Sequence, residues 1–424
     1  MNYSKKVIKE GITVHKIATK KFKTNLFSIF ITTPLSRETI TKNALLGAVL
    51  RMGTASLPAQ DLISKELENM YGASFDCGIE KNGDNHILKF YIESLNDEFL
   101  PEQFDLAKKS LKLLADIVFN PYIENNAFKK EYVESEKNTL RRLIDGKIDN
   151  KTRYAFDRCV EEMYKDKPYG LYKYGYIEDL DGITSENLYS YYKELISSCK
   201  IDVFISGFNL DNLNEDEILA SLSERKANYI PTASIEIEKA TENPKVITEK
   251  MDVTQGKLMI GLDVLNVKDE ENYPAAIYNI ILGGGANSKL FQNVREKASL
   301  AYNAASSYLK NRNNVFIRCG IEINNYEKAV NIIKDQLEQM KNGDFSEEDI
   351  ESAKQLQYAA LKSVKDSQDT EVSYYFSQEL SGKSRDIDES IQRFKAVKKD
   401  EIVGIANRIS INTIYFLTGE GNQE

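Results

Sequence analysis

The sequence predicts an α+β protein made of two homologous repeats, each an antiparallel-rich sheet packed with helices on one side. Residues 245–424 repeat the order of elements in residues 1–211, with strands before and between helices. Residues 212–244 are polar and lack a sustained hydrophobic period, so we interpret them as a linker between two domains. A duplicated domain of this kind is expected to have its two halves facing each other across a cleft.

Hydrophobic period and end signals define the elements of the first repeat. Alternating or β-branched runs predict strands, apolar residues spaced by three and four predict helices, and Gly or Pro marks the ends. In chain order, the predicted elements are strands at 12–18 and 25–33, helices at 44–52 and 60–70, a hairpin at 74–94, helices at 102–119, 127–143 and 151–164, a helix that Thr184 caps, and a strand at 200–207. A short helix at 215–222 is predicted within the linker.

The second repeat has the same order. Its predicted elements are strands at 245–251 and 256–264, helices at 275–282 and 290–297, a hairpin at 302–322, a long helix ended by Gly343, a helix begun by the capping box at Ser346, a helix from residue 399, and a strand at 412–419. The last strand mirrors the one at 200–207 in the first repeat.

Composition argues against several classes of protein. The formal charge of −9 argues against a nucleic-acid surface. The four cysteines have neither metal-ligand spacing nor the pattern of a disulfide framework, which suits a reducing compartment. No apolar run follows the lysines near the N-terminus, and no stretch approaches the length of a membrane span. We therefore expect a cytoplasmic protein without nucleic-acid or membrane partners.

The most informative stretch lies at residues 281–302. An apolar helix runs into Gly283, Gly284 and Gly285, which permit backbone angles and close approaches that a Cβ would forbid. A short helix with Arg295 comes next, and Tyr302 lies seven residues further on. A guanidinium fork and a phenol hydroxyl both suit holding a peptide carbonyl or carboxylate. The residues alone leave a second interpretation open, in which the stretch is a Gly-rich turn with a surface Arg and a core Tyr.

The stretch resembles a known family. Its residues Ser-Lys-Leu-Phe-Gln-x-Val-Arg-Glu-Lys-x-x-Leu-Ala-Tyr, at 288–302, are similar to the second-half signature of the pitrilysin/insulinase-type metallopeptidases. The match covers about fifteen nearly contiguous positions, which makes it specific. The resemblance implies that Arg295 and Tyr302 hold the substrate backbone across a chamber from a zinc site.

The same resemblance implies an inverted zinc motif, His-x-x-Glu-His, in a first-half helix. Aligned on Gly53-Thr54, the motif falls at residues 44–48, which read Ala-Leu-Leu-Gly-Ala and offer no donor atoms. Arg141 and Arg142 stand about where the resemblance puts the third ligand, and cations there would repel a metal ion. The two histidines of the chain, His15 and His86, lie far apart in predicted strands. We expect no catalytic residues and no bound metal or other cofactor in this chain.

Two functions remain. The resemblance implies first a non-catalytic, substrate-binding subunit of a heterodimeric zinc metallopeptidase, inactive alone, whose zinc sits in a paralogue that carries His-x-x-Glu-His. Arg295 would then grip a peptide carbonyl, Tyr302 would donate its hydroxyl to a carbonyl or oxyanion, and Gly283–Gly285 would leave room for the peptide. The alternative is a peptidase-fold scaffold or binding protein without a proteolytic role, for example in an elongation factor P modification pathway. The isolated chain could also form a homodimer.

Overall fold

The computed structural model describes residues 2–102, 104–210, 213–214, 222, 230–233, 243–383 and 385–419. Residues 215–221 of the predicted helix at 215–222, and most of the linker, lie outside the described residues. The chain divides into two compact units. Unit 1 comprises Met1–Gly146, Leu171–Ser234 and Asp366–Ser384, and unit 2 comprises Lys147–Gly170, Ile235–Lys365 and Arg385–Glu424.

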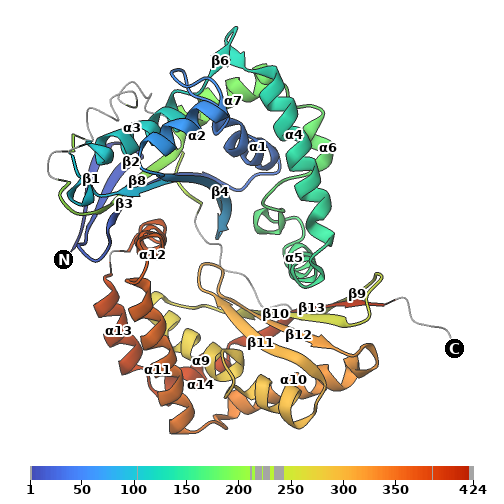
Figure 1. Ribbon diagram of the computed structural model, residues 1–424. Helices are drawn as coiled ribbons and strands as arrows, with labels where there is room; N and C mark the ends of the chain where they lie inside the picture. Colours follow the sequence, from blue (N-terminus) through green and yellow to red (C-terminus); the bar gives the residue numbers. More distant parts are fainter. Residues whose placement is uncertain are drawn as a thin grey trace. The chain divides into compact units, whose positions relative to one another are not determined.

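Unit 1 is built on a six-stranded sheet with the order β1-β2-β8-β3-β5-β4 (Figure 1). Its strands are β1 (Tyr3–Lys9), β2 (Ile12–Ala18), β3 (Thr24–Pro34), β4 (Ser74–Asn82), β5 (Asn85–Leu95) and β8 (Lys200–Gly207). β2 and β8 pair in parallel and the remaining pairs are antiparallel. The sequence did not predict β1, and it did predict the bounds of β8.

The helices of unit 1 come from both halves of the sequence. They are α1 (Ile40–Leu50), α2 (Gln60–Asn69), α3 (Leu106–Phe119), α4 (Lys130–Asp145), α6 (Ile177–Leu180), α7 (Ser185–Ser198) and α12 (Gln368–Leu380), with a small hairpin of β6 (Ile123–Glu124) and β7 (Ala127–Phe128). The capping box predicted at Thr184 is present, because the Thr184 hydroxyl accepts from the Asn187 backbone and the Asn187 side chain accepts in return.

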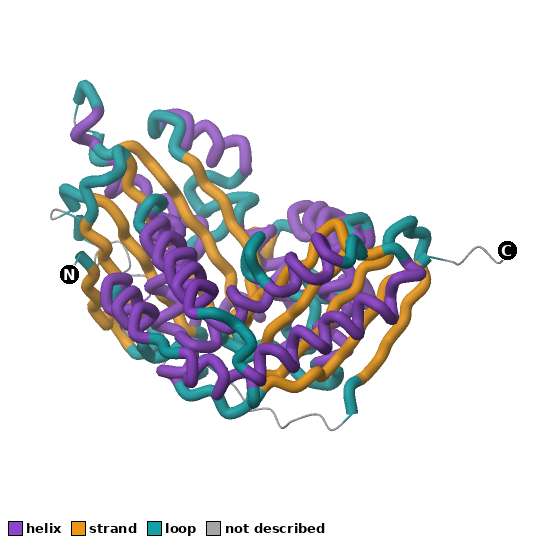
Figure 2. The backbone as a smooth tube through the Cα atoms, turned by 90° about the horizontal axis from the view of Figure 1, so that it is seen from below, coloured by secondary structure: helices purple, strands orange, loops and turns teal. Residues whose placement is uncertain are grey.

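Unit 2 contains a five-stranded sheet with the order β11-β12-β10-β13-β9. Its strands are β9 (Lys245–Lys250), β10 (Gly256–Val264), β11 (Ala301–Leu309), β12 (Asn314–Ile321) and β13 (Ile409–Thr418). Its helices are α5 (Lys151–Met163), α9 (Asn272–Gly283), the π-helix η6 (Phe291–Lys297), α10 (Tyr326–Asn342), α11 (Glu347–Val364), α13 (Ile387–Ala396) and α14 (Lys399–Ala406). Figure 2 traces the helices and strands of each unit.

Each sheet has one face covered by helices from its own half of the sequence, as predicted. In unit 1, Phe27, Ile29 and Ile31 of β3 point into the large core beneath α1, α3 and α7. In unit 2, the side chains of β10 at Leu258 and Ile260 are buried, and the neighbouring residues of β11 and β13 contact α9 and α10 on that same face. This alternation places the other half of each strand's side chains on the opposite face.

Two helices are exchanged between the halves of the sequence. α12, from the second half, covers the opposite face of the unit 1 sheet, where Phe376 stacks on Phe30 with ring centroids 4.0 Å apart. Gln368 at its start donates to the backbone oxygen of Ser206 over 3.0 Å. α5, from the first half, covers part of the opposite face of the unit 2 sheet, where Phe156 meets Phe316 at 5.1 Å. The compact units therefore differ from the sequence division at 1–211 and 245–424.

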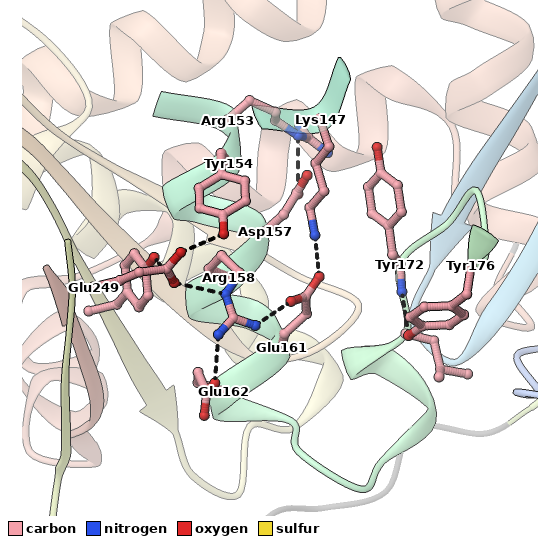
Figure 3. A network of polar contacts seen from close by, with 12 residues as sticks. Lys147, Arg153, Tyr154, Asp157, Arg158, Glu161, Glu162, Tyr172, Tyr176 and Glu249 are labelled. Atoms are coloured by element: carbon pink, nitrogen blue, oxygen red, sulfur yellow. Dashed lines mark hydrogen bonds and ion pairs between the residues drawn. The ribbon is translucent and has the colours of Figure 1, made fainter. Parts of the chain in front are cut away.

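α5 is fixed in unit 2 by a polar network (Figure 3). The guanidinium of Arg158 donates to Glu249 of β9 over 3.1 Å and to Glu161 over 2.7 Å. The hydroxyls of Tyr154 and Tyr415 donate to the same Glu249 carboxylate over 2.5 and 2.7 Å. A carboxylate that accepts from three neighbours is ionised, and the pKa of Glu249 is lowered by these hydrogen bonds, against the effect of its partial burial.

Single-turn 3₁₀ segments link several of these elements, at Asp97–Phe99, Gly146–Ile148, Pro168–Gly170, Asp269–Glu271 and Ile323–Asn325. Within the described residues, no helix combines the length and the apolar character that a membrane-spanning segment needs.

Candidate functional site

Packing requires two of the three glycines at the end of α9. A Cβ at Gly283 would lie 2.5 Å from the backbone nitrogen of Ser306, so only glycine lets the end of α9 approach β11 this closely. Gly284 is similarly crowded by Ile280, whereas a Cβ at Gly285 would meet only an ordinary contact, 3.5 Å from Leu356. None of the three has a positive φ. The expected close approach is therefore present, and the expected unusual backbone angle is not used.

Arg295 lies on the short helix that the sequence predicted at 290–297, which folds as the π-helix η6. π-Helical turns are rare and occur often at functional sites. The guanidinium stacks over the Phe291 ring at 4.4 Å and lies 3.6 Å from the Glu296 carboxylate, with its side chain 43% exposed. Both contacts leave N–H donors of the fork open to a ligand.

Tyr302 is presented to solvent by a β-bulge. Ser299 takes a φ of 53° after the π-helix, and the Leu300 N–H donates to the Val294 oxygen over 3.0 Å, which fixes the chain as it enters β11. Ala301 pairs with Ile321, but Asn303 pairs with Gly320, so Tyr302 is the extra residue of the bulge. Its side chain is 85% exposed. The interpretation of this residue as a core Tyr is therefore wrong.

Tyr302 also borders a pocket of about 130 Å³ on the sheet face that α5 partly covers. The pocket is formed by residues of α5, β10, β11 and β12 and by the turn before β10, namely Thr152, Gln255, Lys257, Met259, Tyr302, Asn303, Arg318, Cys319 and Gly320. Arg295 and the three glycines are not part of this lining. The structure thus brings Tyr302 together with residues that the sequence did not single out.

The helix where the zinc motif was sought is a core helix. Ala44, Leu45 and Leu46 of α1 are buried in the unit 1 core, and a Cβ at Gly47 would touch Ile79 of β4 at 3.3 Å. The Cys77 thiol donates to the Gly47 oxygen over 3.5 Å. Positions 44–47, where the motif would stand, are therefore packed in the unit 1 core.

Arg51 follows the last residue of α1, in the region where the family resemblance implies metal ligands. Burial raises the pKa of the Cys77 thiol to about 11 and also raises that of the Glu136 carboxyl on α4. The charge of Arg51 lowers the pKa of both groups, so it lies near each of them. The described residues contain no cluster of three or more His, Cys, Asp or Glu side chains suited to a metal ion. Arg51 could not be identified from the sequence, because it belongs to no motif with a recognisable spacing.

The remaining residues considered as ligands have structural partners. His15 is fully buried and bonds the Tyr3 hydroxyl at 2.8 Å and Asp202 at 3.0 Å. His86 is also buried, bonds Asn43 at 3.1 Å and donates to the Lys173 oxygen over 2.9 Å. Arg141 pairs with Asp181 at 3.0 Å, and Arg142 donates to Thr139 over 3.4 Å.

Comparison with known proteins gives consistent results. The family model described as the peptidase M16 inactive domain matches residues 182–357. A probable inactive metalloprotease, YmfF of Bacillus subtilis (strain 168), is 36% identical over 413 residues, which cover 96% of this chain and 96% of that protein. The crystal structure of a conserved protein from Enterococcus faecalis V583 superimposes with a TM-score of 0.90 at 26% identity, with all of both chains covered. The peptidase M16 inactive domain structure from Pseudomonas fluorescens has the same fold, with a TM-score of 0.79 at 16% identity over all of both chains.

Proposed function

Because the chain belongs to the pitrilysin/insulinase-type (peptidase M16) family and is an inactive, peptidase-like member of it, we propose that it is the substrate-binding subunit of a two-chain zinc peptidase. Its partner would be a paralogue that carries His-x-x-Glu-His and the zinc. The observation that carries the proposal is the contrast between a first-half helix filled with apolar side chains and a Tyr302 that is 85% exposed on a bulge.

The roles of the two side chains are set by their chemistry. Arg295 keeps guanidinium donors open beside the Phe291 ring, and a planar fork holds a peptide carbonyl or carboxylate through two parallel hydrogen bonds. Tyr302 offers a phenol hydroxyl, which donates to a carbonyl or to the oxyanion that forms when the partner's zinc-activated water attacks. Gly285 has space around its Cα, whereas Gly283 is occupied by the contact with β11, so only the outer end of the loop would leave room for peptide.

The test is peptide hydrolysis by the full chain mixed with a His-x-x-Glu-His paralogue from the same cell. The mixture should cleave unstructured peptides, and each chain alone should not. The double variant Arg295→Ala with Tyr302→Phe should still bind the partner but lower kcat/KM by about a hundredfold, as loss of an oxyanion donor does. Lys297→Ala is the matched control, because Lys297 lies on the same π-helix and its charge is held by Asn293 at 3.2 Å.

Two results would contradict the proposal. An unchanged rate in the double variant would remove the substrate role of the pair. A stable complex that cleaves no peptide would instead favour the scaffold function, with the peptidase fold kept for binding alone.

A further inference from the structure

We propose that the pocket beside Tyr302 is a carboxylate-recognition subsite, in which Lys257 and Arg318 bind an acidic group of the peptide. The acidic group is either the C-terminal carboxylate or the side chain of Asp or Glu. The inference rests on the proposed function, since it specifies which peptides the Arg295/Tyr302 surface would hold. It adds a charge preference that the family resemblance does not contain.

The sheet register brings the two cations together. Met259 pairs with Arg318, and Lys257 pairs with Gly320, so Lys257 and Arg318 are diagonal neighbours on one face of β10 and β12. Gly320 has no side chain, and the Gln255 side chain lies against it, since a Cβ there would meet Gln255 Oε1 at 3.1 Å. Asn303 of β11 pairs with Gly320, and the bulge at Tyr302 places two consecutive residues of β11, Tyr302 and Asn303, on the lining of the pocket.

The pocket has positive charge without a matching negative charge. Its lining contains Lys257 and Arg318 but no Asp or Glu, in a chain whose formal charge is −9. Within the described part of the chain, no hydrogen bond or ion pair reaches the Arg318 guanidinium, and its side chain is exposed. Lys257 donates to the neutral Gln255 side chain over 2.5 Å, and none of its hydrogen bonds to described residues reaches a carboxylate. An acidic ligand is the charge complement of this arrangement.

The other lining groups also suit a carboxylate. Gln255, Asn303, Thr152 and Tyr302 all carry N–H or O–H donors, while Met259 supplies an apolar base. A guanidinium fork binds both oxygens of a carboxylate, and an ammonium adds a point charge. Partial burial lowers the pKa of Lys257, which means that desolvation destabilises its charge and that an anion would relieve this cost. A volume of about 130 Å³ fits a side chain or a chain end.

Binding of matched peptides to the full chain tests the subsite. An N-terminally labelled, unstructured peptide is prepared with a free C-terminal carboxylate and as the C-terminal amide, and each form carries either Glu or Gln at one internal position. Fluorescence anisotropy should show about tenfold tighter binding for the form with the recognised carboxylate, the size expected of a charge-assisted hydrogen bond. The preference should weaken as salt is raised. Which pair of peptides differs identifies the source of the carboxylate.

Variants locate the preference. Lys257→Gln and Arg318→Gln should each remove most of the preference for the carboxylate peptide, and Arg318→Lys should keep part of that preference. Lys341→Gln, which removes an equal charge from a helix surface where Lys341 pairs with Glu338 at 2.7 Å, should leave it intact. Unchanged urea midpoints confirm that each variant is folded.

The outcomes separate the two proposals. Peptides that bind equally well with and without a carboxylate, but more weakly to the Arg295→Ala/Tyr302→Phe variant, would overturn the subsite and leave the proposed function standing. A carboxylate preference that survives in both Gln variants would also overturn the subsite. No binding of any peptide up to millimolar concentration would reject both.

Discussion

The two helix–glycine segments of the chain, α1 with Gly53 and α9 with Gly283, use their glycines alike but present different surfaces. A Cβ at Gly53 would lie 2.8 Å from the Pro58 oxygen, and one at Gly283 would lie 2.5 Å from the Ser306 nitrogen. α9 therefore ends at a glycine that packing requires, and α1, which ends at Leu50, is followed by such a glycine three residues later. Packing of this kind does not explain why Tyr302, further along the second segment, is held in solvent.

The difference lies in burial. Residues 44–46 of α1 are at most 5% exposed, and their identity is explained by the core that they fill. Tyr302 is 85% exposed on the bulge of β11. A large aromatic side chain held in solvent gains no burial energy and costs side-chain entropy when a ligand orders it. The comparison teaches that burial accounts for residues 44–46 but not for Tyr302, which is the residue for which we propose a ligand.

The largest expected effect tests the buried side of this comparison. Leu46→Ala, at a position that is 0% exposed, should lower the free energy of unfolding by about 2–5 kcal/mol, because it leaves a cavity beneath the unit 1 sheet. Leu143→Ala is the matched control in the same unit, where the leucine is 42% exposed, and should cost less than about 1 kcal/mol. Urea unfolding measures both. Equal losses would show that the α1 segment is not core.

A smaller effect tests the polar contact between α1 and β5. His86 donates from Nε2 to the Lys173 oxygen and accepts at Nδ1 from Asn43, so its neutral form is fully bonded. Burial lowers the pKa of His86 from 6.5 to about 4, and the charges of Lys81 and Lys173 contribute to the lowering. Between these two values the unfolded chain binds a proton that the folded chain does not. The stability due to His86 is therefore fully present above pH 6.5 and is lost as the pH falls toward 4.

The pH prediction is checked by comparing wild type with His86→Gln. Wild type should lose about 2 kcal/mol more unfolding free energy between pH 7 and pH 5 than the variant does. Other titrating groups are common to both proteins and cancel in the difference. If the two proteins lose the same amount, the polar contact under α1 does not depend on a neutral His86.

Much of the local structure could be predicted from the sequence because its signals are local. The bounds of β8 and β10 follow apolar runs, with Gly207 at the end of β8 and Gly256 at the start of β10. The helix that starts after Ser346 has the capping box that Asp349 predicts. Gly343 takes a φ of 74° at the end of α10, as a C-terminal glycine does. These elements depend on residues within a few positions of one another.

Elements that depend on distant partners could not be predicted. β1 is a lysine-rich segment with an exposed burial pattern, and it becomes a strand only by pairing with β2 at the sheet edge. The sequence did not predict α12, and it packs on a sheet formed by the other half of the sequence, which no local pattern indicates.

The candidate site shows the same division. Arg295 and Tyr302 stand in a contiguous motif and could be selected from it, whereas their π-helix and bulge are backbone details set by the surrounding sheet. Lys257 and Arg318 come from strands that become neighbours only through the register of β10 and β12. No pattern in the sequence joins them, so the charged pocket was found only in the structure.

The smallest expected effect tests the exposed side of the comparison, with two tyrosines of the same strand. Tyr302→Phe should change the free energy of unfolding by less than about 0.5 kcal/mol, because its hydroxyl lies in solvent. Tyr308→Phe should cost about 1 kcal/mol, because the Tyr308 hydroxyl donates to Asn272 over 2.8 Å and is largely buried. Urea unfolding of the two variants side by side gives the difference. A loss at Tyr302 as large as that at Tyr308 would give its hydroxyl a structural role and remove the argument that exposure at β11 is kept for a ligand.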